Sequence, residues 1–258
     1  MATRAPVQRR DDEPAFVLHA YAYRETSLIV EAFTPAYGRV AMVARGAKRP
    51  RSETRGLLQA FQPLTLSWAG SGELKTLLKA EWRGGLPLPG GSALLCGFYL
   101  NELLLKLLAR EDPHPLLFDE YASALSALAG EPLAAAQASV LRRFEVRLLA
   151  EMGYALQLTR DVESGAGIDP EGRYHYAFDS GPRRVAPNVV RESAARGPLV
   201  RGATLLGLAA NAFPDAETAT EAKRMMREVL DHYLDERHIF SRRVVRDLMA
   251  LDEEGTAS

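Results

Sequence analysis

The alternation of apolar and polar residues in the first third of the chain predicts short β-strands. Leu64, Leu66 and Trp68 alternate with Thr65 and Ser67, the period of two that buries one face of a strand. Other apolar or aromatic runs, separated by turn residues, predict further strands. The expected strands are 15–23, 27–34, 39–47, 61–70 and 73–83. This number of short strands favours a small barrel or half-barrel over a sandwich.

The pattern changes after the run RGGLPLPGG, residues 83–91. Its two prolines and four glycines make it the best candidate for a domain boundary. Beyond it the apolar residues follow a helical period, except across 155–200, which is rich in Gly, Pro, Arg and Asp and shows little periodicity. The expected helices are 92–112, 115–132, 132–154, 201–213, 215–234 and 241–251.

These elements predict a multidomain α+β protein. We expect a small N-terminal β-barrel domain over 1–83, a linker over 84–91, and a helical domain over 92–252 with an irregular insertion at about 155–200. The tail, 253–258, is short and polar and is expected to be disordered.

The charge is unevenly distributed along the 258 residues, although the net charge is only −1. Residues 1–83 carry 13 Lys and Arg against 8 Asp and Glu, a net of +5, and the remainder carry 19 against 25, a net of −6. A basic front and an acidic back suggest two units with different partners.

Six of the 13 basic residues of the front lie in one short stretch with a single acidic residue, GRVAMVARGAKRPRSETRG, residues 38–56. Arginine grips phosphate oxygens well, and Gly and Pro hold such a stretch in an exposed loop between strands. A merely solvated loop is the alternative. Nearby aromatic rings are candidates for stacking on bases, and Tyr23 or Tyr37 would face outward, although the pattern does not choose between them. The candidate DNA-binding residues are Arg39, Arg45, Lys48, Arg49, Arg51 and Arg55.

A second basic group lies in the predicted helices. In VLRRFEVRLLAEMGY, Arg142 and Arg143 adjoin an apolar stripe, a combination suited to an acidic peptide with an apolar end. Lys223 and Arg224 in EAKRMMREVL are weaker candidates for the same role. The alternative is that these cations are solvated or paired with the acidic surface of their own unit.

The sequence offers no catalytic or metal-binding pattern. No phosphate loop, nucleophile elbow or dinucleotide fingerprint occurs, and the acidic stretch 161–172 does not match a calcium loop. The single cysteine, Cys96, is expected to be a buried apolar residue. We therefore predict no enzyme, no cofactor and no metal, and a cytoplasmic protein without a signal peptide or membrane span. The histidines, none in metal-ligand spacing, are His19, His114, His175, His232 and His238.

Several longer runs resemble the RecO family of DNA repair and recombination mediators. YRETSLIVEAFTPAYGRVAMVARGAKRPRS and LQAFQPLTLSWAGSGELKTLLKAEW resemble its N-terminal domain. LRRFEVRLLAEMGY, FPDAETATEAKRMMREVLDHYL and IFSRRVVRDLM resemble its helical domain. The resemblance spans about residues 14–250, and the combination of these runs is more specific than any one of them.

The resemblance implies an OB-fold in the front domain and a role without catalysis. It implies binding to single- and double-stranded DNA, strand annealing, partnership with RecR, contact with the acidic tail of the single-stranded-DNA-binding protein, and help in loading RecA, in a cytoplasmic, nucleoid-associated protein. Some members carry a four-cysteine zinc motif after the GY helix. The matching segment here, 158–184, contains no cysteine, so no zinc is expected.

Two other classes of function remain open from the residues. One is a non-catalytic interaction adaptor whose barrel binds a peptide. The other is a hydrolase whose site has no recognisable motif.

Overall fold

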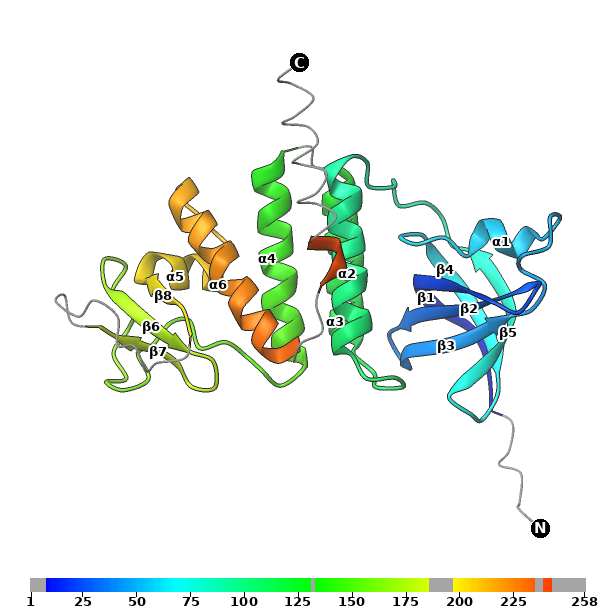
Figure 1. Cartoon of the computed structure of the whole chain (residues 1–258), viewed down its shortest axis with the longest axis horizontal. Coiled ribbons are helices and arrows are strands. Elements are labelled where there is room, and N and C mark those ends of the chain that lie inside the picture. Colours follow the sequence, from blue (N-terminus) through cyan, green and yellow to red (C-terminus); the bar gives the residue numbers. More distant parts are fainter. Residues whose placement is uncertain (1–7, 131–132, 186–196, 235–238, 243–258) are drawn as a thin grey trace, which may run out of the picture. The chain divides into compact units, whose positions relative to one another are not determined.

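The computed structural model describes residues 8–130, 133–185, 197–234 and 239–242 (Figure 1). The chain forms two compact units, one made of residues 1–132 together with 239–258, the other of residues 133–238. The predicted boundary at 83–91 lies between a strand and a helix of the first unit.

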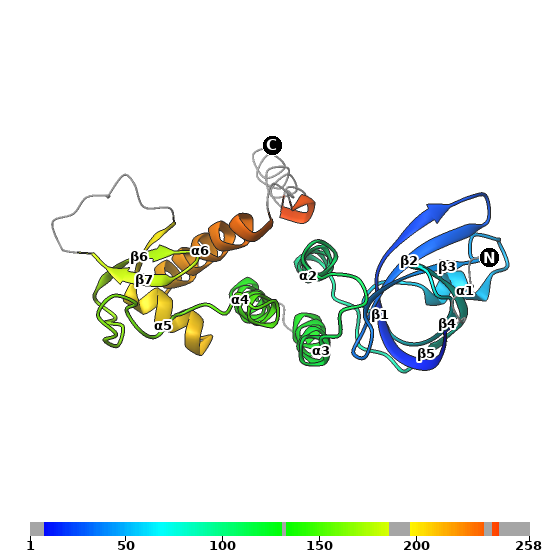
Figure 2. The same cartoon turned by 90° about the horizontal axis from the view of Figure 1, so that it is seen from below.

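The first unit contains a closed five-stranded barrel. Its strands are β1 (Arg9–Tyr23), β2 (Ser27–Thr34), β3 (Gly38–Ala44), β4 (Pro63–Ala69) and β5 (Leu74–Trp82), in the order β1-β2-β3-β5-β4. All neighbouring pairs are antiparallel except β3 with β5. A short helix, α1 (Glu53–Leu57), lies between β3 and β4. Figure 2 looks along this barrel, so the strands appear as a ring. The topology is that of an OB-fold, and the predicted small barrel is confirmed.

Alternation along the strands fills the barrel interior. Val17, Val30, Met42, Leu66 and Trp68 are each at most 2% exposed and belong to one cluster of inward-facing side chains. The alternation predicted for 64–68 is therefore confirmed for its apolar members, which point inward.

The first strand begins six residues earlier than predicted. Arg9 pairs with Ala69 and Glu13 with Leu66, across a bulge at which Asp12 has φ 55°. The backbone N–H of Asp12 donates to Ser67 Oγ at 3.0 Å. These polar residues become a strand because β4 supplies the pairing partner, which a local hydrophobic pattern does not report.

Two predicted helices complete the first unit. They are α2 (Ser92–Leu107) and α3 (Pro115–Gly130), which pack on each other and on β1 and β2. Buried Asn101 donates from its side-chain amide to Leu18 O at 2.9 Å, and the Tyr121 hydroxyl donates to Asn101 Oδ1. Burial raises the pKa of Tyr121, so this hydroxyl keeps its proton. The helices are thus tied to the barrel wall by polar contacts inside an apolar interface.

A segment from the far end of the chain returns to α2. The backbone N–H groups of Phe240 and Ser241 donate to the Glu102 carboxylate at 2.7 and 2.8 Å, and Ser241 Oγ donates to it at 2.7 Å. Burial raises the pKa of Glu102, but the Lys106 ammonium and these donors outweigh it and lower the pKa below its ordinary value. Of the helix predicted over 241–251, only Ser241 and Arg242 lie among the described residues, and both are helical.

The second unit combines helices with a small sheet. Its helices are α4 (Ala134–Glu151), α5 (Gly202–Ala210) and α6 (Ala216–Leu234), as predicted within a few residues. Its strands are β6 (Arg173–Ala177), β7 (Gly181–Arg184) and β8 (Leu199–Arg201), in the order β7-β6-β8. The segment 155–200, which was expected to be an irregular insertion, thus contains β6, β7 and the start of β8. They are three to five residues long, too short for a pattern of period two to stand out.

A carboxylate organises the loop that precedes this sheet. Asp161, 4% exposed, accepts from the N–H groups of Glu163 and Ser164 and from Ser164 Oγ, and its second oxygen accepts from Arg184 N at 2.6 Å. These bonds join the 161–165 turn to β7. The hydrogen bonds from Ser164 are the main cause that lowers the pKa of Asp161. This segment, which lacks cysteine, does not fit a thiolate zinc site and is closed by a carboxylate instead.

Candidate nucleic-acid interface

The basic stretch leaves β3 and forms a folded loop at one end of the barrel. Gly46 has φ +71°, a conformation that favours glycine, and Ala47 is buried beneath the loop. The N–H of Lys48 donates to Thr26 O at 2.9 Å, which ties the loop to the β1–β2 turn. The N–H of Arg49 donates back to Gly46 O at 3.0 Å. The sequence thus produces an ordered loop that is held on the barrel by its backbone.

Four of the five cationic side chains that follow β3 are exposed. No ion pair to a carboxylate is found for them within the described part of the chain, although Glu53 in α1 and Glu25 in the β1–β2 turn lie in the same region. Lys48, which is half-buried, donates from Nζ to Arg24 O at 3.3 Å. The exposed members are Arg45, Arg49, Arg51 and Arg55.

Arg24 belongs to the same end of the barrel, although the sequence analysis did not select it. It lies in the β1–β2 turn with φ 51°, is exposed, and its guanidinium sits 5.1 Å from the ring centroid of Tyr23. The bond from Lys48 to its carbonyl brings it beside the basic loop. Its position in a turn between two predicted strands was the only available signal, because the neighbouring loop lies more than 20 positions away in the sequence. We call Arg24, Arg45, Lys48, Arg49, Arg51 and Arg55 the basic rim.

Arg39 is placed elsewhere. It is near the opposite end of β3 from Arg45, about 20 Å along the strand. Its Nη1 atom pairs with Glu31 Oε2 at 3.2 Å, and its Nη2 atom donates to Leu108 O at 3.0 Å. Arg110 also pairs with the 3%-exposed Glu31 carboxylate. The structure therefore gives Arg39 a place in the packing between the barrel and the loop after α2, and does not bring it to the basic rim.

The two aromatic candidates lie at different ends of the barrel. Tyr23 is half-buried beneath Arg24 at the basic rim, and Tyr21, 45% exposed, precedes it on the same face of β1. Tyr37 stacks edge-on against Trp68 at 5.4 Å and lies under Arg10, in the turn between β2 and β3. Tyr23 and Tyr21 are therefore the rings that adjoin the basic rim.

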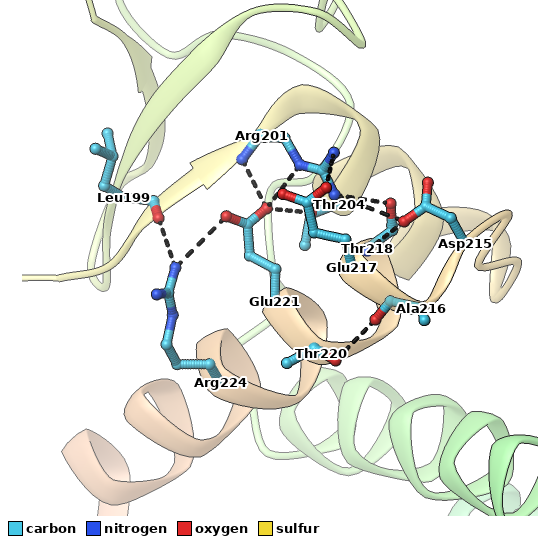
Figure 3. Close-up of polar contacts among 10 residues, drawn as sticks. All are labelled: Leu199, Arg201, Thr204, Asp215, Ala216, Glu217, Thr218, Thr220, Glu221 and Arg224. Atoms are coloured by element: carbon cyan, nitrogen blue, oxygen red, sulfur yellow. Dashed lines mark hydrogen bonds and ion pairs between the residues drawn. The ribbon is translucent and has the colours of Figure 1, made fainter.

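The four cations proposed for peptide binding lie on α4 and α6, which pack together in the second unit. Arg142 is 8% exposed and pairs with the buried Glu145, while Arg143 is exposed. Lys223 is also exposed. Arg224 donates to Leu199 O at 3.1 Å and contacts Glu221 at 3.5 Å (Figure 3).

The start of α6 holds a dense network of charges, shown in Figure 3. Arg201 lies within 3.7 Å of Asp215, 3.2 Å of Glu217 and 3.6 Å of Glu221. Asp215 caps the helix by accepting from Thr218 N at 2.6 Å, a bond that is the first cause of its lowered pKa. The network holds the end of β8 against the start of α6. Arg224 already contacts Leu199 and Glu221 of the same unit.

No metal-ligating cluster of three or more His, Cys, Asp or Glu side chains occurs among the described residues. Of the described helices, none has the length and apolar character needed to cross a membrane. His238 lies outside the described residues. His19 packs against Tyr21 and His232 against Phe178, at centroid distances of 4.3 and 4.5 Å.

The fold and the site define a class of protein. It is an OB-barrel protein with an appended helical domain, whose barrel carries an ordered rim of exposed cations. The family model "Recombination protein O N terminal" matches residues 11–85, and "Recombination protein O C terminal" matches residues 90–243. The chain belongs to the RecO family of DNA repair proteins.

Curated relatives agree over nearly the whole chain. The DNA repair protein RecO of Aromatoleum aromaticum is 50% identical over 244 residues, covering 95% of this chain and 98% of the relative. Those of Azoarcus sp. and Dechloromonas aromatica are 48% and 49% identical, covering 95% and 93% of this chain and 98% and 97% of theirs. A role in DNA repair and recombination follows from this membership.

Proposed function

We propose that this protein is a non-catalytic recombination mediator that binds single- and double-stranded DNA at the basic rim and promotes the annealing of complementary strands. One observation carries the proposal: the rim presents exposed arginines that no carboxylate of the described residues neutralises. The loop that carries Lys48 and Arg49 is held on the barrel by the bond from Lys48 N to Thr26 O.

The affinity would come mainly from counterion release. If about four phosphates are neutralised, log affinity should fall with log salt concentration at a slope of about −3 to −4. Arginine forks bind phosphate whatever the base, and Tyr21 and Tyr23 offer rings on which any base can stack. The mode of binding therefore needs no sequence readout, and annealing needs no catalytic side chain.

We further propose that the second unit docks the acidic tail of the single-stranded-DNA-binding protein. Arg143 and Lys223 are exposed on α4 and α6, and Arg142 Nε is buried without a hydrogen-bond acceptor within the described residues. A carboxylate from a partner would satisfy that donor. Arg224 already contacts Glu221, and it would contribute by exchanging this carboxylate for one of the acidic tail.

These two activities would make the chain an intermediary at single-strand gaps. Tethering to coated strands raises the local concentration of the basic rim on DNA. Together with RecR, the protein would then assist RecA loading, in the bacterial cytoplasm near the nucleoid.

The test is a salt titration of DNA binding by the full chain. A variant with Arg49→Ala, Arg51→Ala and Arg55→Ala should bind weakly and lose about 2 to 3 from the magnitude of the salt slope. The matched control is Arg9→Ala, Lys79→Ala and Arg184→Ala, which removes the same charge from exposed residues that already pair with carboxylates. Equal DNA affinity of the two variants would overturn the assignment of the basic rim. A barrel that binds a peptide but not DNA would favour the alternative function, a non-catalytic interaction adaptor.

A further inference from the structure

The small sheet of the second unit has two unlike faces. Alternation along β6 buries Tyr174 and Tyr176 and leaves Arg173 exposed and His175 half-buried on the opposite face. In the register of β6 with β7, Arg183 lies directly opposite His175. Arg173, His175 and Arg183 thus lie close together on one side of the sheet, which we call the basic face.

The two arginines of the basic face have no ion-pair partner among the described residues. Neither Arg173 nor Arg183 makes an ion pair there, and His175 Nε2 is buried with no hydrogen-bond partner. The other arginines of this sheet differ: Arg184 pairs with Asp169 at 2.7 Å, and Arg201 with Glu217 at 3.2 Å.

Two guanidinium groups on one sheet face repel each other. No carboxylate of the described residues forms an ion pair with Arg173 or Arg183; the nearby Asp215, Glu217 and Glu221 pair with Arg201, the neighbour of Arg173 on β8. Asp179, the carboxylate in the β6–β7 turn, has His232 as its ion-pair partner, at 3.6 Å. Such an arrangement favours an anion from outside the unit.

We propose that the basic face binds the phosphodiester backbone of a second nucleic-acid strand. This inference rests on the proposed function, in which the basic rim binds the first strand. Arginine on two neighbouring strands presents donors to successive phosphates.

The chemistry of the face selects this occupant over an acidic peptide. No large apolar side chain of β6, β7 or β8 is exposed, so the face offers no pocket for the apolar end of a peptide. A charged backbone needs no such pocket.

A second strand site would explain how one chain can anneal two strands. The basic rim and the basic face lie in different units of one polypeptide, so a strand on each is held at high effective concentration relative to the other. Each surface lowers the charge repulsion between the strands by neutralising phosphates.

Asp161 is a positioning residue for this face. Its carboxylate accepts from Arg184 N, and Val162 N donates to Pro182 O at 2.9 Å, so the 161–165 turn holds β7 along its length. Arg183 is thereby fixed at its place opposite His175.

The test compares Arg173→Gln plus Arg183→Gln with Arg184→Gln, in the full chain. Arg184 is the neighbour of Arg183 on the same strand, on the other face, and already has a carboxylate partner. We would measure binding of a labelled first oligonucleotide, binding of a second, non-complementary labelled oligonucleotide to the preformed complex, and the annealing rate of complementary strands.

The double variant should bind the first strand as the native protein does. It should bind the second strand about tenfold more weakly and anneal more slowly in proportion, because two charge-assisted contacts are lost. Arg173→Lys plus Arg183→Lys keeps the charge and should recover most of both activities, which separates a phosphate contact from a folding defect.

Second-strand binding and annealing at native rates in the double variant would overturn the inference while the proposed function stands. The inference would also be overturned if the double variant lost binding of an acidic peptide but still bound the second strand. Failure of the native protein to bind even the first strand would instead overturn the proposed function.

Discussion

The guanidinium of Arg39 and the carboxylate of Glu31 form an ion pair of 3.2 Å between neighbouring strands of the barrel. Glu31 is 3% exposed and also receives Arg110 from the loop that follows α2. The pair lies where the barrel contacts its own helical hairpin, whereas the basic rim lies at the other end of β3. Arg39 and Arg45 belong to the same basic stretch but have different surroundings, so their substitution should affect stability differently.

Arg39→Ala should lower the free energy of unfolding by roughly 1.5 to 3 kcal/mol, because it removes charged hydrogen bonds from a buried carboxylate. Arg45→Ala, at the exposed rim, should change it by less than about 0.5 kcal/mol. Urea unfolding of the full chain measures both. Equal stability of the two variants would show that the Glu31 pair is not structural.

The glycine that begins β3 should tolerate no side chain. A Cβ at Gly38, where φ is +60°, would lie 1.9 Å from the backbone oxygen of Asp112. Gly38→Ala should therefore cost more than about 2 kcal/mol, from left-handed strain and overlap with backbone that cannot move freely.

The control is Gly56→Ala in α1. Gly56 has no atom within 4 Å of an added Cβ, so this change should be neutral or should stabilise by about 0.4 to 1 kcal/mol. Thermal unfolding compares the two, and a Gly38→Ala protein as stable as the native chain would contradict the close approach.

The turn held by Asp161 should open in acid. Its folded-state pKa is lowered, so its contribution to stability is fully present above the unfolded value, near 3.8, and is lost as pH falls through the lower folded value. Hydrogen exchange of the 158–185 segment should therefore accelerate below about pH 4 beyond the intrinsic pH dependence.

Asp161→Asn should accelerate this exchange already at neutral pH and remove its acid-dependent component. The amide nitrogen of asparagine would face Arg184 N, a donor opposite a donor, in place of the 2.6 Å bond. Glu163→Gln, an exposed change in the same turn, is the control and should leave both unaltered. If protection of this segment from hydrogen exchange in the native protein did not depend on pH, the Asp161 carboxylate would not be the group that holds the turn.

Local patterns predicted most of the fold because burial leaves a period in the sequence. Leu64, Leu66 and Trp68 carry the alternation of β4, and the apolar spacing in α2 to α6 shows which faces pack. The polar start of β1 and the short strands of the second sheet have no such period. They form because partners distant in the sequence supply hydrogen bonds, as Ala69 does for Arg9.

The candidate site was predictable in composition but not in arrangement. The charge run identified Arg45 to Arg55 as a group, and the structure leaves its arginines exposed. It did not reveal that Arg39 faces a buried carboxylate or that the β1–β2 turn brings Arg24 beside Lys48. Both facts depend on strand register, which a single sequence does not specify.

The return of Phe240 and Ser241 to Glu102 has a consequence for how the molecule is made. The first unit contains residues from both ends of the polypeptide, and the second is inserted between them. During translation the barrel and α2 are made before the second unit, whereas the donors of Phe240 and Ser241 to Glu102 are made after it. Until residues 240 and 241 are made, Glu102 keeps its ion pair with Lys106 but lacks the three bonds from Phe240 and Ser241, so the packing of the first unit is completed only after the second unit has been synthesised.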